Sequence, residues 1–239
     1  MNKVSAKYKR ILLKVSGEAL SGAKGTGFDE PTMSAICAGI KEAHDEGCQI
    51  GIVVGGGNFW RGRTSGAMER TCADKIGMMA TVMNCLAVAD ALNQQGLETC
   101  VMSALFMPQI AQPFTRGEAV KNMEEGRIVL FGGGTGNPFF STDTATALRA
   151  IEIGADVMFK ATMVDGVYDK DPKKYPDAVK YDRLSFSEVL EKQLGVMDLT
   201  AATLCRENHL PIFVFDLHDP KNIARAVRGE GNGTLVIEE

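Results

Sequence analysis

The sequence has few histidines, no closely spaced pair of cysteines and no long apolar run. Its three histidines, His44, His209 and His218, are scattered and fit no metal-binding spacing. Six cysteines lie mostly within apolar segments and include no C-x-x-C pair, which is typical of reduced structural thiols in a cytoplasm. No stretch approaches the ~20 apolar residues of a membrane span, and the basic N-terminus lacks the apolar stretch of a secretory signal. We therefore expect a cytoplasmic protein with no membrane partner.

The net charge and several missing motifs argue against other classes of protein. The net charge of −4 gives no sign of a nucleic-acid footprint, so any phosphate binding must be local. The sequence has no G-x-x-x-x-G-K-[ST] motif, and neither central glycine loop satisfies G-x-G-x-x-G. These absences argue against a P-loop kinase and weaken a dinucleotide-binding interpretation. The sequence also lacks a G-x-S-x-G elbow and a Cys–His motif, so a hydrolase is a poor interpretation.

Apolar runs alternate with helix-like segments along the 239 residues, a length that allows one large α/β domain or two lobes. This alternation predicts a mostly parallel sheet covered by helices on both faces. Segment 73–95 is apolar nearly all round, so we expect a buried helix there. Residues 22–27 show no periodicity and are expected to form a flexible loop. We expect strands at 11–15, 50–54, 99–102, 128–131, 156–160, 211–215 and 235–237, and helices at 29–47, 73–95, 117–125, 144–153, 185–194, 199–208 and 222–227.

The stretch Arg127–Asp143, RIVLFGGGTGNPFFSTD, carries the strongest functional signal. Four glycines within five residues follow a strand-like run, and amide and hydroxyl donors come next. Such glycines let backbone N–H groups approach an anion, and the start of the next helix adds partial positive charge. A tight turn is the alternative, but it needs only one or two glycines. Two further turns, 14–17 and 55–58, follow other strands, so all three are expected at the carboxyl edge of the sheet, where ligands bind.

Charged residues near these turns are candidates for catalysis. Lys14 lies inside ILLKVSG, where an ammonium group is placed to bridge transferring phosphates, although a solvated lysine is the ordinary alternative. Arg61 offers a planar, fixed charge to a phosphate. Asp74, Asp143 and Asp198 lie at the starts of predicted helices, so helix capping and a catalytic role both stay open for them.

The chain resembles the bacterial uridylate (UMP) kinases of the amino acid kinase family from residue 8 to about residue 237. The resemblance rests on the motifs YKRILLKVSGEAL, GGGNFWRG, ADKIGMMATVMN, GTGNPFFSTD, VDGVYDKDP and VMDLTA. GTGNPFF, together with the helix of Asp74, matches the UMP-phosphorylating branch in particular. The resemblance implies an α/β fold, a three-layer αβα sandwich with a mostly parallel central sheet. It also implies a single domain over 1–239, with an acceptor-side lobe at 1–155 and an ATP-side lobe at 156–239.

The resemblance implies a kinase that converts UMP and ATP to UDP and ADP in pyrimidine nucleotide biosynthesis, with Mg²⁺ held largely by ATP oxygens and water rather than by protein ligands. The catalytic residues that it implies are Lys14, Arg61, Asp143 and Asp198. ATP contacts fall on Lys14, Val15, Ser16, Gly17, Gly57, Arg61, Thr162, Tyr168 and Asp171. UMP contacts fall on Gly56, Asp74, Thr135, Gly136, Asn137, Pro138, Phe139, Phe140, Ser141 and Thr142. A segment linked to activation by GTP matches Gly22, Ala23, Lys24, Gly25, Thr26 and Gly27.

Members of this family are usually homohexamers, and UTP commonly inhibits them. The sequence departs from the family pattern at two places. Met163 replaces a basic residue of many members, which affects one expected contact with the nucleotide. The connection from Arg61 to Asp74 is shorter than in several relatives, so we expect different responses to effectors. A carboxylate kinase of the same fold, such as an acetylglutamate kinase, and a non-catalytic storage or binding protein are alternatives. The donor-rich run 135–142 favours a nucleotide acceptor, and the presence of Lys14 and Arg61 favours an enzyme.

Overall fold

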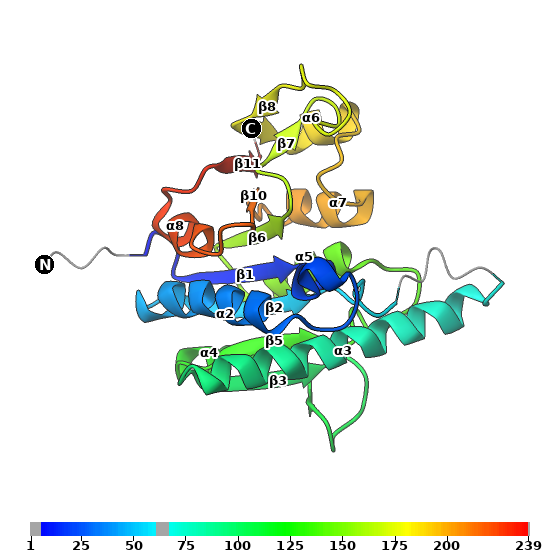
Figure 1. Cartoon of the computed structure of the whole chain (residues 1–239), viewed down its shortest axis with the longest axis vertical. Coiled ribbons are helices and arrows are strands. Elements are labelled where there is room, and N and C mark those ends of the chain that lie inside the picture. The colour runs from blue at the N-terminus through cyan, green and yellow to red at the C-terminus, as the bar shows by residue number, and fades with distance from the viewer. Residues whose placement is uncertain (1–5, 61–66, 239) are drawn as a thin grey trace, which may run out of the picture.

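A nine-stranded sheet forms the centre of the computed structural model, which describes residues 6–60 and 67–238 (Figure 1). The strands lie in the order β4-β3-β5-β2-β1-β6-β10-β11-β9, and within the described residues every neighbouring pair is parallel except β10 and β11. The predicted mostly parallel α/β sheet is therefore confirmed. The strands are β1 (Arg10–Val15), β2 (Gln49–Val54), β3 (Thr99–Ser103), β4 (Gln112–Pro113), β5 (Ile128–Gly132), β6 (Val157–Thr162), β9 (Arg183–Ser185), β10 (Ile212–Asp216) and β11 (Gly233–Ile237).

Helices cover both faces of the sheet, because successive strand residues point to opposite sides. Ile11, Leu13 and Val15 of β1 lie in one apolar core with residues of α2, α3 and α8, whereas Leu12 lies in a second core with residues of α4, α5, α6 and α7. Lys14 has the parity of Leu12 and so belongs to the α5 side. The helices are α2 (Glu30–Asp45), α3 (Arg70–Gln94), α4 (Arg116–Glu124), α5 (Thr142–Ile153), α6 (Phe186–Glu191), α7 (Leu199–Glu207) and α8 (Asn222–Arg228).

Two predicted helix starts are confirmed in detail. The Asp29 carboxylate accepts a hydrogen bond from the Thr32 amide, with Pro31 in the first turn of α2. Ser185 and Glu188 form the expected reciprocal capping box at the start of α6, each side chain bonding the backbone of the other. These caps satisfy amide groups that have no partner inside a helix, which explains why the sequence marks both starts.

Several short elements were not predicted, because each is too short to show a periodic pattern. α1 (Gly17–Leu20) and the 3₁₀ helix η1 (Gly22–Lys24) follow β1, and a hairpin of β7 (Val167–Tyr168) and β8 (Lys180–Tyr181) follows β6. The short strands β4 and β9 were not predicted either. Figure 1 shows the hairpin beside α6, at the top of the view.

The loop 22–27 is more structured than the prediction of a flexible loop allowed. It contains η1, and its second half is hydrogen-bonded to Asn58. The Thr26 hydroxyl and the Gly27 amide donate to the Asn58 carbonyl, and the Asn58 side chain donates to the Gly27 carbonyl. The loop is therefore tied to the glycine turn that follows β2.

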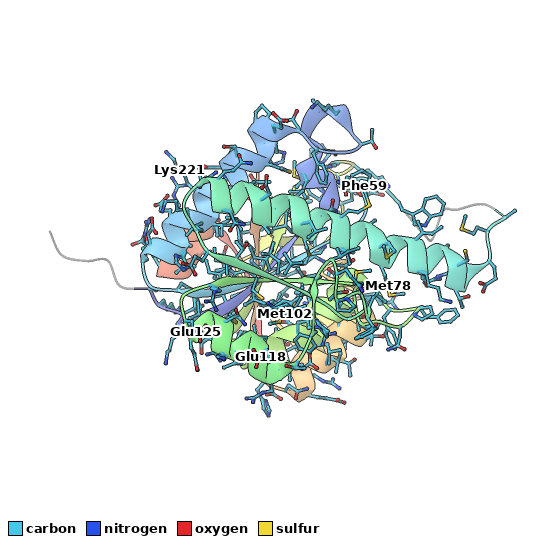
Figure 2. The ribbon with its side chains drawn as sticks, turned by 90° about the horizontal axis from the view of Figure 1, so that it is seen from below. Phe59, Met78, Met102, Glu118, Glu125 and Lys221 are labelled. Atoms are coloured by element: carbon cyan, nitrogen blue, oxygen red, sulfur yellow. The ribbon has the colours of Figure 1, made fainter. Side chains whose placement is uncertain are left out.

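The expectation that α3 is buried all round is wrong for one of its faces. Met79 and Met83 are 41% and 45% exposed, and Ile76 and Leu86 lie on the same outer face. Figure 2 shows α3 extending across the width of the molecule. The expectation that no stretch approaches a membrane span is also wrong by length and composition, because α3 meets both criteria, but half of that window (50%) is buried against the rest of the protein, as in a core helix.

The six cysteines are all free, and five of them are buried, as expected for structural thiols. Burial raises the pKa of the Cys85 thiol on α3 to about 12. Only Cys72 is exposed. The buried thiols therefore fill the core and carry no negative charge at neutral pH.

Candidate active site

Lys14 and Lys160 converge on one carboxylate at the carboxyl edge of the sheet. The two lysines pair directly in the register of β1 and β6. The Lys14 ammonium lies 3.1 Å from Oδ1 of Asp143, and the Lys160 ammonium donates a hydrogen bond of 2.8 Å to Oδ2. Asp143 is in the first turn of α5, so the positive end of that helix also faces the cluster. The three side chains form a compact charged group with one excess positive charge.

Burial and charge pairing act against each other in this group. Burial by itself raises the pKa of the Asp143 carboxyl, but the ammonium groups of Lys14 and Lys160 outweigh that effect and leave the pKa below its ordinary value. Burial lowers the pKa of Lys160, and the attraction of Asp143 only partly offsets this. Asp143 is therefore ionised at neutral pH, and it holds both lysines in place.

One cavity, of about 280 Å³, lies on the Lys14 side of this group. All three predicted glycine turns contribute to it, and Gly133 and Gly134 adopt positive φ angles of 79° and 59° that favour glycine. Among residues 6–60 and 67–238, the lining residues whose amide N–H has no hydrogen-bond partner include Gly17, Gly56, Gly57, Gly134 and Thr135. Unpaired amides beside an ammonium group are suited to binding phosphate oxygens.

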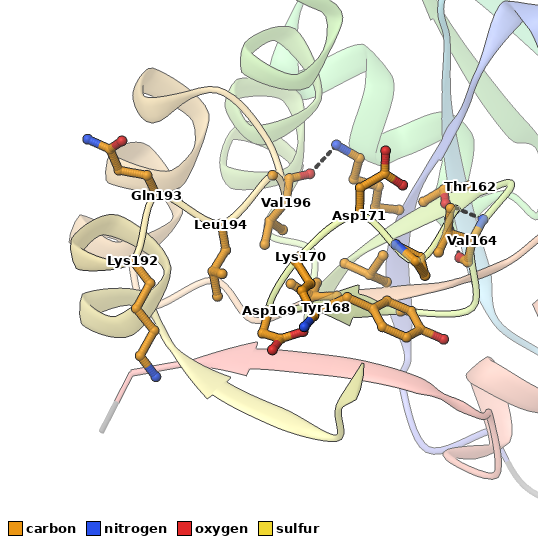
Figure 3. Close-up of a pocket in the computed structure, with 16 residues that line it drawn as sticks. Thr162, Val164, Tyr168, Asp169, Lys170, Asp171, Lys192, Gln193, Leu194 and Val196 are labelled. Carbon is orange, nitrogen blue, oxygen red and sulfur yellow. Dashed lines mark hydrogen bonds between the residues drawn. The ribbon is translucent and has the colours of Figure 1, made fainter. Parts of the chain in front are cut away.

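A second cavity, of about 430 Å³, lies on the Lys160 side (Figure 3). Tyr168 and Asp171 line one side of it, and Lys192 to Val196 line the other. The Tyr168 hydroxyl donates a 2.7 Å hydrogen bond to Asp165, which raises the pKa of Tyr168. Lys14 lines one cavity and Lys160 lines the other. Asp143 contacts both lysines and therefore connects the two cavities.

Asp74 holds the chain near the entrance of the smaller cavity. Its Oδ2 accepts hydrogen bonds from Arg70 at 2.7 Å and from the Phe139 amide at 2.8 Å. Phe139 has a positive φ of 73°, a strained conformation for a side-chain-bearing residue, and its ring lies under the Arg70 guanidinium. The helix-capping alternative for Asp74 is wrong, because Glu69 caps α3.

Asp143 and Asp198 differ in whether they cap a helix. Ser141, rather than Asp143, caps α5, so the capping alternative is wrong for Asp143 as well. Asp198 does cap α7, through the Ala201 amide at 3.0 Å. It also accepts hydrogen bonds from the hydroxyl groups of Ser141 and Thr144. Asp198 thus ties the start of α7 to the start of α5, and its negative charge also acts on Lys160, where it partly offsets the lowering of the lysine pKa by burial.

The structure gathers most, though not all, of the residues predicted for the site. Val15 is only 2% exposed and lines neither cavity, and Gly136 and Pro138 line neither cavity as well. Phe139 lines an adjoining cavity of about 690 Å³. Arg61 lies outside the described residues. The 22–27 segment lines neither cavity, and it is hydrogen-bonded to Asn58, the last residue of the glycine turn after β2. Predicted residues around the 280 Å³ cavity are Lys14, Ser16, Gly17, Gly56, Gly57, Asp74, Thr135, Asn137, Phe140, Ser141 and Thr142, and those around the 430 Å³ cavity are Thr162, Tyr168 and Asp171.

Lys160 was missed by the sequence analysis, although its signal was present. It lies inside the strand VMFKAT, as Lys14 lies inside RILLKV, and a lysine in a buried strand requires a partner. Arg70 and Trp60, which line the smaller cavity, were also missed. Arg70 is recognisable as a residue four positions before Asp74 on one helix. Trp60 carries no such signal.

Comparison with known proteins identifies close relatives over nearly the whole chain. The model of the amino acid kinase family matches residues 9–216. The UMP kinase from Bacillus anthracis is 36% identical, with a TM-score of 0.94 and 97% of each chain covered. The UMP kinase from Ureaplasma parvum is 34% identical, with a TM-score of 0.92, covering 97% of this chain and 100% of that one. The uridylate kinase from Archaeoglobus fulgidus is 31% identical, with a TM-score of 0.74, covering 95% and 99%.

Proposed function

The chain belongs to the amino acid kinase family, and from that premise we propose that it transfers the γ-phosphoryl group of ATP to UMP, giving UDP and ADP. The observation that carries the proposal is the position of Asp143 between two cavities, with Lys14 on one side and Lys160 on the other. Donor and acceptor phosphates that approach from the two cavities would meet at this group. The similar structures are UMP kinases, so the carboxylate kinase and the storage protein are not favoured.

We assign UMP to the 280 Å³ cavity and the ATP nucleoside to the 430 Å³ cavity. Asp74 and the 135–142 segment would hold UMP, and Thr162, Tyr168 and Asp171 would hold ATP. The phosphates of ATP would extend to Lys14 and to the unpaired amides of Gly17 and Gly57. Residues 1–155 then act as the acceptor-side lobe and residues 156–239 as the ATP-side lobe.

The transfer itself requires alignment and charge neutralisation more than covalent chemistry. Lys14, with Arg61, would neutralise charge on the transferring group, and Asp143 would hold Lys14 in position. Asp198 would act more remotely, by fixing the start of α5 through Ser141 and Thr144. No residue is required to remove a proton, because the UMP phosphate is already mostly a dianion at neutral pH.

Mg²⁺ would enter as part of the MgATP substrate. Within the described residues there is no group of three metal-ligating side chains. The carboxylate oxygens of Asp143 face two ammonium groups, and those of Asp198 are hydrogen-bonded to hydroxyl and amide groups. These donors leave no resident cage, which fits a cation coordinated by nucleotide oxygens and water.

We further propose a homohexamer that works in the cytoplasm in pyrimidine nucleotide biosynthesis. The outer face of α3, with Ile76, Met79, Met83 and Leu86, supports assembly because single-chain proteins seldom expose such a stripe. GTP as activator and UTP as inhibitor complete the proposal. The hydrogen bonds from the 22–27 segment to Asn58 supply a path from that segment to the acceptor cavity.

A coupled assay of ADP formation tests the proposed reaction. MgATP is supplied with UMP, CMP or acetylglutamate as the acceptor, and we expect rapid turnover with UMP alone. Lys14→Ala is expected to abolish transfer while UMP binding, measured by calorimetry, stays nearly intact. Turnover that prefers acetylglutamate, or near-normal turnover in Lys14→Ala, would contradict the assignment.

A further inference from the structure

The buried face of α3 contacts both glycine turns that line the acceptor cavity. The first turn is Gly55–Asn58, after β2, and the second is Gly132–Gly136, after β5. Thr81 and Asn84 lie on that face, three positions apart, and are 5% and 0% exposed. Residues three positions apart lie on the same side of a helix, so both side chains reach toward the carboxyl edge of the sheet.

Thr81 holds the second turn. Its hydroxyl donates a hydrogen bond of 2.7 Å to the Met78 carbonyl in its own helix. With its proton thus committed, the hydroxyl oxygen accepts a 2.9 Å hydrogen bond from the Gly133 amide. Gly133 is the first residue of the turn with a positive φ. The Thr81 oxygen therefore fixes the point at which the chain leaves β5.

Asn84 holds the first turn. Its side-chain amide donates to the Gly55 carbonyl at 2.6 Å and to Oδ1 of Asn58 at 2.8 Å. Its own Oδ1 accepts a 3.0 Å hydrogen bond from the Asn58 side chain. The first and last residues of the turn are thus both bound to one side chain, which leaves the amides of Gly56 and Gly57 between them without partners in the described residues.

Close packing leaves these turns little room to adjust. A Cβ atom placed on Gly56 would lie 2.9 Å from the Gly77 carbonyl oxygen, and one on Gly132 would lie 3.1 Å from the Cα of Val82. Both glycines therefore lie directly against α3, where a shift of the helix or of its polar side chains displaces the turn. Phosphate-binding amides need such support, because a displacement of about 1 Å is enough to impair transfer.

We propose that Thr81 and Asn84 are positioning residues for the acceptor: through the Gly133 amide and the Gly55 carbonyl, they set the spacing of the two glycine turns that line the acceptor cavity. This inference rests on the proposed function, since it assigns the acceptor phosphate to this cavity. Thr81 lines the acceptor cavity itself, and neither residue lines the 430 Å³ cavity, so we expect little effect on the nucleoside end of ATP.

The test compares Thr81→Val with Thr81→Ser, since valine keeps the shape without the hydroxyl and serine keeps the hydroxyl. Loss of one neutral hydrogen bond corresponds to about tenfold in an equilibrium. We expect Thr81→Val to lower kcat/KM for UMP about tenfold while the KM for ATP changes less than about twofold, and Thr81→Ser to restore most of the loss. Val88→Ala, one turn beyond Asn84 in the same buried face, is the control for general destabilisation.

Hydrogen exchange of the 127–137 peptide, measured by mass spectrometry without nucleotide, tests the contact independently of catalysis. We expect about tenfold faster exchange in Thr81→Val, with little change in Thr81→Ser or Val88→Ala. Unchanged exchange in Thr81→Val would overturn the proposed contact, and faster exchange with unchanged kcat/KM for UMP would overturn the positioning role. If the wild-type protein does not phosphorylate UMP, the proposed function is wrong. Faster exchange confined to Thr81→Val would still show that the Thr81 hydroxyl stabilises the turn after β5.

Discussion

Lys14 and Lys160 lie opposite each other on neighbouring parallel strands, and a single carboxylate, that of Asp143, separates their charges. Two largely buried ammonium groups side by side are unfavourable unless an anion lies between them. Asp143 supplies that anion in the protein alone, and phosphate oxygens would join it during the reaction. The arrangement therefore makes both the stability and the activity depend on one ionised side chain.

Asp143→Asn is expected to lower the free energy of unfolding by about 3 kcal/mol near neutral pH, because two lysines lose their partner. The folded protein lowers the pKa of Asp143 below 3.8, so its stabilisation is fully present above that value and is lost as the pH falls through the folded pKa. In urea unfolding, the difference between wild type and variant should be constant above about pH 5 and shrink below about pH 4. Asp45→Asn, at an exposed ion pair, is the control. A difference that persists at the lowest pH would refute the linkage.

Asp74→Asn is expected to raise the KM for UMP at least about tenfold and to leave the KM for ATP nearly unchanged, since the charge that pairs with Arg70 is lost. The matched control is Glu69→Ala, because Glu69 is the residue that caps the same helix. That variant should lose about 1 kcal/mol of stability with little change in either KM. Steady-state kinetics measure the effect on each KM, and thermal unfolding measures the effect on stability. Equal effects of both variants on UMP would show that Asp74 only stabilises the helix.

The contrast between Asp74 and its capping alternative shows what the sequence could and could not supply. Local patterns predicted the longer strands, the glycine turns and the caps at Asp29 and Ser185, because these depend on neighbouring residues. The sequence did not indicate that α3 begins at Arg70, so Asp74 was placed at a helix start when it lies a full turn inside. The residue that caps α3 is Glu69, which is not among the usual capping residues Ser, Thr, Asp and Asn, so no sequence pattern marked this start.

Lys160 illustrates the same limit for the site. It is 146 positions from Lys14, and only the pairing of β1 with β6 brings the two together. Strand order is not encoded in any one segment, so a second lysine in an apolar strand stayed unconnected to the first. The exposure of the outer face of α3 could not be predicted for the same reason. The apolar composition of the helix predicted burial on all sides, but packing decides which side meets the sheet.

The exposed face of α3 leads to a prediction about assembly. Met83→Arg is expected to convert the proposed hexamer to smaller species, because a charge in the middle of an apolar contact loses its hydration. Val179→Arg, at an exposed apolar residue of the hairpin region, should leave the assembly unchanged. Size-exclusion chromatography with light scattering measures both. A Met83→Arg protein of wild-type mass would place the subunit contact elsewhere.

The 22–27 segment allows basal activity and regulation to be separated. Lys24 is largely exposed and pairs with Asp29, so Lys24→Ala is expected to blunt activation by GTP without lowering basal turnover. Thr26→Val removes the hydrogen bond to the Asn58 carbonyl and should reduce basal turnover several-fold, to roughly the extent expected for one lost hydrogen bond. Initial rates with and without millimolar GTP check both. A wild-type protein that is indifferent to GTP would remove the regulatory assignment.

The pH dependence of the reaction tests whether the protein supplies a base. The three histidines lie away from both cavities: His44 contacts the Gly126 carbonyl, His209 pairs with Glu238 and His218 with Asp216. Replacing all three is therefore expected to leave the pH–rate profile in place, apart from some loss of stability. The acceptor is a phosphate monoester whose second pKa is about 6, so its dianion is already the nucleophile near neutral pH.

The low-pH limb of kcat/KM for UMP should follow ionisation of that phosphate, because kcat/KM reports groups of the free reactants. A UMP analogue with a more acidic phosphate is expected to move the limb to lower pH by the difference between the two phosphate pKa values. The limb in the triple histidine variant should move by the same amount. If the limb ignores the analogue but shifts when one side chain is replaced, that side chain is a catalytic base, and phosphate ionisation does not control the reaction.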